Sequence, residues 1–534
     1  MIVLTYYKVI IITIEGLDLR GICKGFIGRI YTSLNPVRVV DGVLTCGGRV
    51  VFVGSSKDVE SLCRVLNCEL VDLKSYTALP GFIDSHIHLL DVGEILNSLD
   101  LRGVKSIEEF KRLLKDFSKS RSNWVIARGF DHELLSSGRM LSRYDLDEVV
   151  PDKPVVAIRV CGHLGILNSK ALEVLRLSGV STTDLSSGVV VEDVLDNVLE
   201  SIRYEMSLDE FEKLLVDAQN HLMRFGVTSV GLISTTVSDK LLLALLSLQR
   251  KKALKIRVRM YMSYKTLKSL GLLTKVLSSL GNEWLRVVGV KFFADGSLGA
   301  RTALLSKPYS DDPLTSGVEV MSREELTQAL RDVVGLGFQP AVHAIGDKAL
   351  DNVLEAADTV GLVGPDSFRV EHASVVRDDQ LELITKLRPG IAIQPHFILT
   401  DWWVVKRVSL ERVRFLYRFK TLLNLNLVIG LSTDAPVEPV DPWETIYAAV
   451  TRGCLDSIEL CRYSEDEKLT LTEALHLYTT GSARLLRDYE VGSLEVGRLA
   501  DIVVVDRDPF KTSDPKELRK VSTVKVFIGS EEVF

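Results

Sequence analysis

The sequence predicts an α/β fold: a (β/α)8 TIM barrel, a small β-sandwich domain built from both ends of the chain, and a large insertion after the first barrel strand. Three observations predict it. Strand-like apolar runs alternate with longer amphipathic stretches through the middle of the chain, as in parallel βα arrays. Eight such runs follow one another, the number that closes this barrel. Short β-rich runs gather at both ends of the chain.

The two β-rich ends are predicted to form one domain. Runs rich in β-branched residues occupy residues 26–54 and 500–528, where prolines and glycines separate the individual strands. We therefore assign residues 26–77 with 488–534 to a composite β domain, and residues 78–487 to the barrel with its insertion. Residues 1–25 fit either an extra strand or an extension that begins upstream of the true start.

The barrel strands are expected in order along the middle of the chain. The candidates are residues 78–83, 227–232, 256–262, 286–293, 338–342, 368–370, 390–393 and 427–431. The first gap is much too long for one connecting helix, so residues 91–200 are predicted to form the insertion. Helical patterns within it lie at residues 107–117 and 169–177.

Composition disfavours several classes of protein. With 46% hydrophobic residues, 25% charged residues and a net charge of −6, the chain lacks the basic character of a general nucleic-acid binder. The early apolar run 9–14 is too short to span a membrane, and residues 1–15 offer neither the basic start nor the small-residue cleavage site expected of a signal peptide. The seven cysteines form no CxxC pair, so we expect mostly reduced residues in a cytoplasmic protein. Residues 241–248 are apolar almost all round, which a buried helix or a contact in a homo-oligomer would explain equally.

The first motif with chemical meaning is His86-Ile87-His88, at the end of the first predicted strand. Alternate side chains of a strand point to the same side, so the two imidazoles converge. Neutral imidazole is a common metal donor. A bare His-x-His is more often a pair of surface or core histidines, but barrels of this kind keep their active sites at the carboxyl ends of the strands. The placement therefore favours a metal site.

Further candidate ligands lie on other predicted strands. His343 and His372 follow the fifth and sixth strands, Asp434 follows the eighth, and Lys291 lies within the apolar fourth. Burying an ammonium group costs several kcal/mol unless it is paired or modified. Singly, these residues fit a core histidine, a helix cap or a lysine that reaches the surface. Together with the His-x-His pair they predict a metal centre.

Seven segments of the chain carry a family resemblance. They are PGFIDSHIH (80–88), GHLG (162–165), DGSLG (295–299), HAIGD (343–347), EHAS (371–374), STDAPVEP (432–439) and GRLADI (497–502). In these segments the chain resembles the amidohydrolase superfamily, in particular its YtcJ-like group, which includes N-substituted formamide deformylases. The resemblance extends from residue 26 to the C-terminus and says much less about the substrate than about the family.

The resemblance implies a set of metal ligands. His86 and His88 would hold one metal ion that Asp434 also touches, and His343 and His372 would hold a second. Lys291 would bridge both ions as a carbamate formed with carbon dioxide. A single ion remains an alternative. Zinc is the expected metal, because it suits mixed imidazole and oxygen donors and leaves a position open for water.

The expected reaction is hydrolysis of a non-peptide C–N bond of the amide type in a small molecule. A bound metal lowers the pKa of its water from about 15.7 to near 7, and Asp434 would take the proton and pass it to the leaving amine. Hydrolysis of a cyclic amide, an imide or an ester, or a deamination, would use the same centre. A barrel that binds or regulates without catalysis is the alternative from another class, which the complete set of ligand types disfavours.

Five more residues are candidates for catalysis or substrate binding. His163, in the insertion, would stabilise charge or bind substrate, and a structural histidine is an equal alternative. Asp295 would orient a metal ligand. Arg301 would pair with a substrate carboxylate or form a structural ion pair. His396 and Trp402 would line the pocket, where Trp402 could equally pack its own loop.

Overall fold

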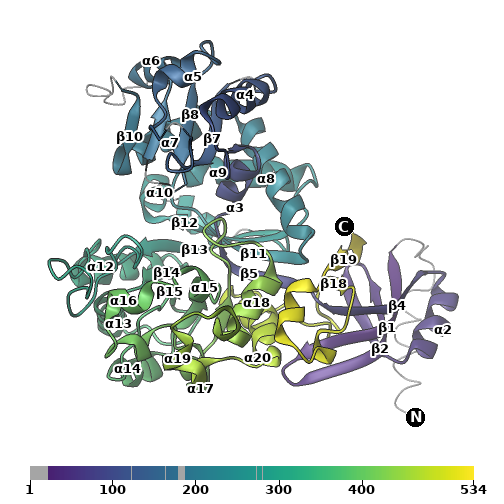
Figure 1. The fold of residues 1–534 in the computed structure, drawn as a ribbon. Helices are drawn as coiled ribbons and strands as arrows, with labels where there is room; N and C mark the ends of the chain where they lie inside the picture. Colours follow the sequence, from purple (N-terminus) through teal and green to yellow (C-terminus); the bar gives the residue numbers. More distant parts are fainter. Residues whose placement is uncertain are drawn as a thin grey trace. The chain divides into compact units, whose positions relative to one another are not determined.

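The computed structural model describes residues 22–534 apart from 122, 137, 161, 163, 178–186, 272 and 280. The chain divides into two compact units. The first consists of Met1–His88, Gln219–Ser234 and Leu254–Phe534, and the second of Leu89–Ala218 and Thr235–Ala253. The first unit holds an eight-stranded and a seven-stranded sheet, and the second holds a five-stranded sheet (Figure 1).

Eight parallel strands form the barrel sheet in the order β17-β16-β15-β14-β13-β12-β11-β5. They are β5 (Phe82–Ile87), β11 (Val227–Ile233), β12 (Arg257–Ser263), β13 (Leu285–Phe293), β14 (Gln339–Ala344), β15 (Arg369–His372), β16 (Gly390–Ile393) and β17 (Ile429–Leu431). The backbone N–H of Asp434 donates to His86 O and that of His88 donates to Ala435 O, both at 2.9 Å. These bonds link the two ends of the sheet, and the predicted barrel is confirmed.

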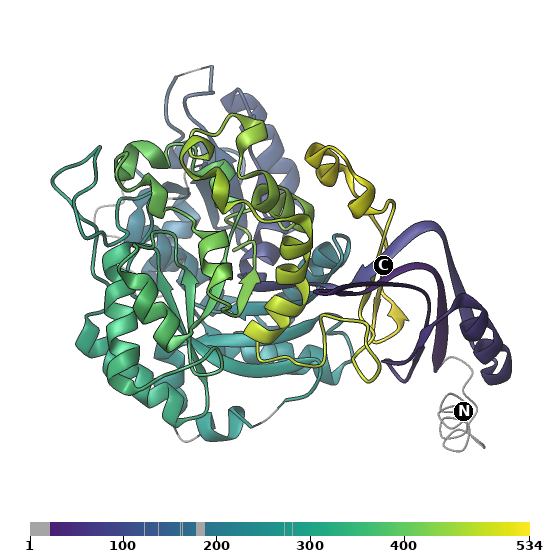
Figure 2. The ribbon, with the colours of Figure 1, turned by 90° about the horizontal axis from the view of Figure 1, so that it is seen from below.

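Helices follow the barrel strands and surround them (Figure 2). They are α10 (Tyr264–Leu270), α11 (Leu273–Leu277), α12 (Arg323–Gly335), α13 (Asp347–Val360), α14 (Gln380–Leu387), α15 (Phe397–Thr400), α16 (Val404–Val408), α17 (Phe419–Asn424), α18 (Pro442–Thr451), α19 (Cys461–Ser464), α20 (Leu471–His476) and α21 (Ser482–Leu485). Helix α12 begins with a capping box between Ser322 and Glu325, and α13 ends at Gly361 in the left-handed conformation. Both signals stabilise helix ends by satisfying free backbone groups.

The first barrel strand begins later than predicted. Residues 78–80 end β4 (Glu69–Pro80) of the other sheet, and β5 starts at Phe82. Between them, Gly81 lies so close to Thr228 that a Cβ atom there would come within 2.3 Å of the threonine hydroxyl. One apolar run of the sequence therefore contributes strands to two different sheets. The pattern of hydrophobic residues does not reveal where the first strand ends and the second begins. The other seven predicted strands are confirmed, with ends that shift by two residues at most.

The seven-stranded sheet combines both ends of the chain in the order β20-β19-β18-β4-β1-β2-β3. Its other strands are β1 (Cys23–Leu34), β2 (Val37–Cys46), β3 (Arg49–Gly54), β18 (Ile502–Val505), β19 (Thr523–Ile528) and β20 (Glu531–Glu532), accompanied by α2 (Ser56–Leu66). Phe26 on β1 and Phe527 on β19 touch edge to face with centroids 5.0 Å apart, although a flat sheet would separate these strands by roughly 14 Å. The sheet therefore curls around one core. Two parts of this single continuous sheet face each other and pack as the two layers of a sandwich would.

Two buried ion pairs join β12 to the C-terminal segment. Arg257 donates two hydrogen bonds to Asp501, at 2.7 and 2.8 Å, and Arg259 donates to Asp488 at 2.8 Å. All four side chains are almost completely excluded from solvent. These contacts connect the barrel with the composite sheet, because Asp501 directly precedes β18.

The second unit contains a sheet that the sequence did not predict. Its strands, in the order β10-β9-β8-β7-β6, are β6 (Leu99–Asp100), β7 (Val125–Phe130), β8 (Val155–Arg159), β9 (Leu164–Leu167) and β10 (Val189–Val191). Alternate residues of β8 enter two separate cores, Val155 and Ala157 on one face and Val156 and Ile158 on the other. Strands of two to six residues are too short to show a clear period.

Helices accompany this sheet in the second unit. They are α3 (Leu89–Leu96), α4 (Ile107–Ser118), α5 (Arg143–Asp147), α6 (Ser169–Leu177), α7 (Glu192–Glu205) and α9 (Ser238–Arg250), while α8 (Leu208–Met223) runs from the second unit into the first. The helices predicted at residues 107–117 and 169–177 correspond to α4 and α6. The apolar stretch 241–248 lies in α9, where it is partly buried within the unit. None of the described helices is long and apolar enough to cross a bilayer.

The cysteines correct the expectation of mostly reduced thiols. Disulfides join Cys23 to Cys46 and Cys454 to Cys461. The two cysteines of the first pair lie directly opposite each other in the β1–β2 ladder. They are too far apart in the sequence for a CxxC motif to reveal this pairing. Cys63 and Cys68 carry free thiols, with their sulfur atoms 2.6 Å apart.

Candidate metal centre

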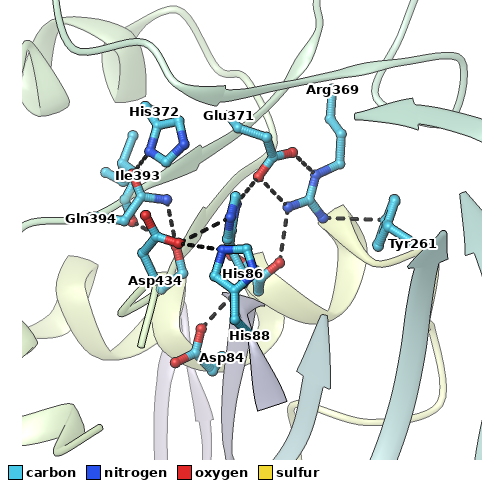
Figure 3. Close-up of polar contacts among 12 residues, drawn as sticks. Asp84, His86, His88, Tyr261, Arg369, Glu371, His372, Ile393, Gln394 and Asp434 are labelled. Carbon is cyan, nitrogen blue, oxygen red and sulfur yellow. Dashed lines mark hydrogen bonds and ion pairs between the residues drawn. The ribbon is translucent and has the colours of Figure 1, made fainter. Parts of the chain in front are cut away.

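Strand β5 and the residue that follows it place His86 and His88 next to one carboxylate. Their Nε2 atoms lie 3.2 and 3.1 Å from Asp434 Oδ1 (Figure 3). One ligand atom from each of the three residues can be chosen so that all lie within 4.8 Å of one another. The alternation of a strand and the loop after β17 therefore bring together three donors of the kinds that bind zinc.

Asp434 has an environment that suits a cation. Its Oδ1 atom is buried and makes no hydrogen bond of good geometry within the described chain. Burial raises the pKa of this carboxyl, but His86 and His88 outweigh burial and hold the pKa well below its usual value. The residue also adopts a left-handed φ of 59°, which is uncommon outside glycine and is found at sites where the surrounding structure imposes it.

Glu371 and Arg369 on β15 fix the orientation of His86. The Nδ1 atom of His86 lies 2.5 Å from Glu371 Oε2, so Nε2 remains for a ligand. Arg369 in turn donates to Glu371 Oε2 at 2.7 Å and to the hydroxyl of Tyr261 at 3.2 Å (Figure 3). Burial raises the pKa of Glu371, but Arg369 and His86 outweigh it and hold the pKa well below its usual value. Such a chain of partners fixes the tautomer of a metal-binding imidazole.

The other two histidines are oriented in the same manner. His372 Nδ1 lies 2.8 Å from Gln394 Oε1, and His343 Nε2 lies 2.8 Å from Gly296 O. The two rings are 4.5 Å apart between centroids, and the ring of His86 is 5.1 Å from that of His372. Burial lowers the pKa of His343 to about 3 and that of His372 well below its usual value. Both imidazoles are therefore neutral, as metal binding requires.

The backbone at His372 explains how neighbouring residues serve one site. Glu371 and His372 are adjacent, and adjacent side chains of a regular strand point to opposite faces. His372 and Ala373 have left-handed φ values of 75° and 46°. This turn ends β15 and lets both Glu371 and His372 contribute to the cluster.

Lys291 on β13 is a buried amine without a counter-charge in contact. It is 3% exposed. Within the described chain its Nζ atom makes no hydrogen bond or ion pair and lies 4.8 Å from the centre of the Phe293 ring. Burial lowers the pKa of this lysine to about 8. An ammonium group in this environment is costly, so the position suits a neutral or modified amine.

The six predicted metal ligands line one cavity of about 330 Å³. They are His86, His88, Lys291, His343, His372 and Asp434. Apolar walls come from Phe293, Leu298, Ile345, Phe397 and Val437, and further polar groups from Ser297, Ser374, Asp401 and Tyr417. All of these residues belong to the first compact unit. The cavity therefore combines clustered donors with an apolar wall, as small-molecule sites do.

Asp295 and Arg301 lie outside the lining of this cavity. The Asp295 carboxylate accepts hydrogen bonds from the backbone N–H groups of Ile345, Gly346 and Leu304, at 2.7 to 3.0 Å. Its Oδ1 atom is 3.5 Å from His343 Nε2. Arg301 makes a two-pronged contact with Asp311, at 2.8 and 3.2 Å. Asp295 thus anchors the loops around His343, and the guanidinium of Arg301 is already paired.

His396 and Trp402 also lie outside the cavity lining, and His163 lies outside the described residues. The His396 ring hydrogen-bonds to Glu438 through Nδ1, and its Nε2 is 3.8 Å from Glu444. Trp402 is 61% exposed.

Several residues of the site were missed by sequence reasoning. Glu371 directly precedes His372 within a recognised motif, so its position offered a signal. Gln394 directly follows β16, at the same edge as the histidines, where a polar residue after an apolar strand could have been noticed. Asp401 and Tyr417 lie in irregular segments that carry no pattern.

Comparisons with known proteins extend over nearly the whole chain. The model of the Amidohydrolase family matches residues 69–533. YtcJ of Bacillus subtilis (strain 168) is 30% identical over 526 residues, which cover 95% of this chain and 98% of that protein. The N-substituted formamide deformylase of Arthrobacter pascens is 26% identical over 537 residues, with coverage of 92% and 96%. The crystal structure of an uncharacterized metal-dependent hydrolase from Pyrococcus horikoshii OT3 has 41% identity and a TM-score of 0.85, and covers 92% of this chain and 98% of that chain.

Proposed function

The chain is a metal-dependent hydrolase of the amidohydrolase family, and we propose that it cleaves a non-peptide C–N bond of the amide type in a small molecule. The observation that carries the proposal is the convergence of six donor side chains from five barrel strands and their loops on one cavity. The likeness to an N-substituted formamide deformylase supports the amide bond.

His86, His88 and Asp434 would hold one divalent cation, and His343 and His372 would help to hold a second. Imidazole nitrogens with carboxylate oxygens suit zinc, and the buried Asp434 Oδ1 without a good hydrogen bond fits such an ion. A cation bound there supplies Lewis acidity, which favours the deprotonation of water and polarises the substrate carbonyl.

Asp434 is the residue that would move the proton. Its carboxylate is ionised at neutral pH because His86 and His88 outweigh the effect of burial and lower its pKa. It would accept a proton from the attacking water and return it to the leaving amine as the C–N bond breaks. The products are an acid and an amine. Glu371 and Arg369 would keep His86 in its productive orientation throughout.

Lys291 would contribute as a carbamate. The neutral Nζ attacks carbon dioxide, an N–C bond forms, and the amine proton leaves to solvent. This reaction replaces a costly buried cation by an anion with two oxygen donors. The absence of any hydrogen bond or ion pair at Nζ within the described residues supports the proposal.

Metal analysis with a panel of substrates tests the function. Purified protein should contain zinc or another divalent cation, and a chelator should remove both the ion and the activity. The panel comprises N-formyl amines, N-acyl amino acids, cyclic imides, aryl esters and amino-substituted heterocycles. Activity on N-formyl or other open-chain amides is expected. A preference for the imides, the esters or the deamination substrates would assign the alternative chemistry, and chelator-resistant activity would reject the metal-dependent mechanism.

Lys291→Ala tests the carbamate separately. The variant should lose bound metal and activity, and short carboxylic acids such as acetate should restore part of both by supplying the missing oxygen donor. Lys386→Ala, which alters an exposed lysine of α14 paired with Asp358, serves as the matched control. Unchanged metal content and rate in Lys291→Ala without added acid would reject the bridging role.

A further inference from the structure

The wall of the cavity carries a carboxylate that the hydrolytic machinery does not use. Asp401 directly follows α15, and Tyr417 lies between Val413–Phe415 and α17. The tyrosine hydroxyl donates to Asp401 Oδ2 at 2.5 Å. Both residues line the same cavity as the six candidate ligands. The pair is therefore available to a molecule that occupies the metal centre.

One oxygen of Asp401 remains to bind a ligand. Within the described chain the only hydrogen bond to this carboxylate comes from Tyr417, and it reaches Oδ2. Glu438 lies near enough to raise the pKa of Asp401 by repulsion, so a second carboxylate adds negative potential at this wall. An ionised carboxylate with a free oxygen beside another acid attracts a cationic hydrogen-bond donor.

Among the described residues that line the cavity, no lysine or arginine besides Lys291 could compensate this carboxylate. Lys291 itself belongs to the metal centre. The nearby Arg407 donates to the backbone oxygens of Leu298 and Gly299 and stacks on the Trp403 ring, with 4.2 Å to its centroid. Arg407 lies near enough to Asp401 to lower its pKa, but its guanidinium is engaged in these contacts and Arg407 is not among the lining residues.

The phenol that holds Asp401 is itself fixed. The backbone N–H of Tyr417 donates to Ser374 O at 2.8 Å, and its carbonyl accepts a hydrogen bond from the buried Arg452 at 2.8 Å. Tyr417 also has a left-handed φ of 49°, a conformation that persists where surrounding contacts impose it. These contacts hold the Asp401–Tyr417 pair in place before a substrate arrives, which reduces the entropy cost of binding.

We infer that Asp401 and Tyr417 form a subsite for an ammonium group, and that the substrates are amides that carry such a group beyond a short apolar segment. Monoacylated diamines are the simplest members of this class. Phe293, Phe397 and Val437 would contact the carbon chain, while the amide lies at the metal centre. The inference rests on the proposed function and specifies its substrate.

The same arrangement disfavours N-acyl amino acids. Their carboxylate would lie beside another carboxylate, Asp401, and apart from Lys291 of the metal centre no lysine or arginine is among the described lining residues. Arg301, predicted to bind a substrate carboxylate, is paired with Asp311 outside the lining.

Three substrates with the same five-methylene chain test the inference on the metal-loaded enzyme. They are N-formyl-1,5-diaminopentane, N-formylhexylamine and N-formyl-6-aminohexanoate, which end in an ammonium, a methyl and a carboxylate group. Homologues from diaminoethane to diaminohexane cover other lengths. We expect kcat/KM for the best ammonium substrate to exceed that of its methyl analogue by roughly tenfold or more, since a charge-assisted hydrogen bond replaces an apolar contact. The carboxylate should be the poorest substrate.

Variants assign the preference to the subsite. Asp401→Asn should bring the ammonium-to-methyl ratio of kcat/KM close to one, and Tyr417→Phe should lower it as well. Glu411→Gln, which alters an exposed residue outside the cavity lining, should keep the wild-type ratio. A wild-type enzyme that hydrolyses the methyl analogue as well as the ammonium substrate, or an unchanged ratio in Asp401→Asn, would overturn the inference and leave the proposed function standing.

A binding measurement separates this inference from the proposed function. If no amide in the series is hydrolysed, the proposed function fails, and calorimetric titration with n-hexylammonium chloride then decides whether the subsite exists. The wild type should bind this cation about tenfold more tightly than Asp401→Asn. Equal affinity would refute the subsite.

Discussion

One ring nitrogen on each of three histidines of the cavity is already engaged. His86 uses Nδ1 with Glu371, His372 uses Nδ1 with Gln394, and His343 uses Nε2 with Gly296 O. Each contact leaves the opposite nitrogen as the candidate metal donor. These partners orient the three rings, and we expect any affinity for metal to depend on them.

Glu371 is the partner whose removal should matter most. We expect Glu371→Gln to weaken zinc affinity by about 10- to 100-fold, because the amide holds His86 less strongly and leaves Arg369 buried without its counter-ion. Titration with a competing chromophoric chelator measures the affinity. Glu382→Gln, on the exposed face of α14, is the matched control. Equal affinities in the two variants would contradict the orienting role.

The ammonium preference should depend on pH through Asp401. Burial raises the pKa of this carboxyl to about 6; the hydrogen bond of Tyr417 lowers it, Glu438 raises it and Arg407 lowers it. Besides burial, Tyr417, Glu438 and Arg407 are the leading influences on this pKa among the described residues. Above its pKa the ionised carboxylate attracts the ammonium group, and the attraction is lost as pH falls through about 6.

The measurement compares kcat/KM for the ammonium and methyl substrates at pH values between about 5 and 8. The ratio cancels effects that both substrates share, such as protonation of the metal centre. We expect the ratio to fall on the acid side with a midpoint near 6, and to be flat in Asp401→Asn. A flat wild-type profile would show that Asp401 does not select the ammonium group.

At the scale of single residues, sequence reasoning found donors and missed their partners. His86 and His88 were predictable because strand alternation is a local rule. Glu371 became a partner of His86 only because β15 lies where its carboxylate reaches across the barrel, and because the left-handed turn at His372 lets both residues face the site. Such contacts depend on three-dimensional register and leave no periodic signal.

Among the elements, the β1–β2 hairpin shows the same limit. The two strands could be predicted from their composition, but the register that places Cys23 opposite Cys46 could not. In the second unit, α4 and α6 were predicted from their helical period, whereas the short strands β6 to β10 were not. Long elements with a buried stripe carry enough residues to show a period, and short strands do not.

The disulfide of this hairpin should stabilise the first unit. Closing a loop of about 24 residues is worth roughly 3 kcal/mol in the chain-entropy model. Cys46→Ser should therefore lower the unfolding temperature under non-reducing conditions, as measured by calorimetry. Cys68→Ser, which alters a free thiol in the same β domain, should have a smaller effect. If both variants unfold at the same temperature as the wild type, the Cys23–Cys46 bond contributes nothing measurable.

Across the whole molecule, the barrel could be predicted from the sequence. The point at which the chain passes from the seven-stranded sheet into the barrel could not. Seven of the eight barrel strands matched because each is a buried apolar run bounded by loops. The first was displaced because β4 and β5 share one apolar run on either side of Gly81. Assignment to one sheet or the other depends on pairing with β18, far away in the sequence.

Asp501 connects this shared sheet with the barrel. It accepts two hydrogen bonds from the buried Arg257 and one from the backbone N–H of Gly529. Asp501→Asn should destabilise the protein by about 3 to 5 kcal/mol, because it leaves a buried guanidinium without its counter-charge. Chemical denaturation of the full-length protein measures the loss in its free energy of unfolding. Glu517→Gln breaks an exposed ion pair with Lys520 and should cost less than about 1 kcal/mol; a comparable loss in both variants would contradict the importance of the buried pair.

The pairing of β4 with β18 has a consequence for synthesis of the protein. Residues 69–80 leave the ribosome long before residues 502–505, so β4 must wait for nearly the entire chain before its partner exists. During that time one edge of β4 offers unpaired backbone groups to other nascent chains. A product that terminates before residue 502 keeps this edge permanently open, and we expect such fragments to aggregate or be degraded even when every barrel strand is present.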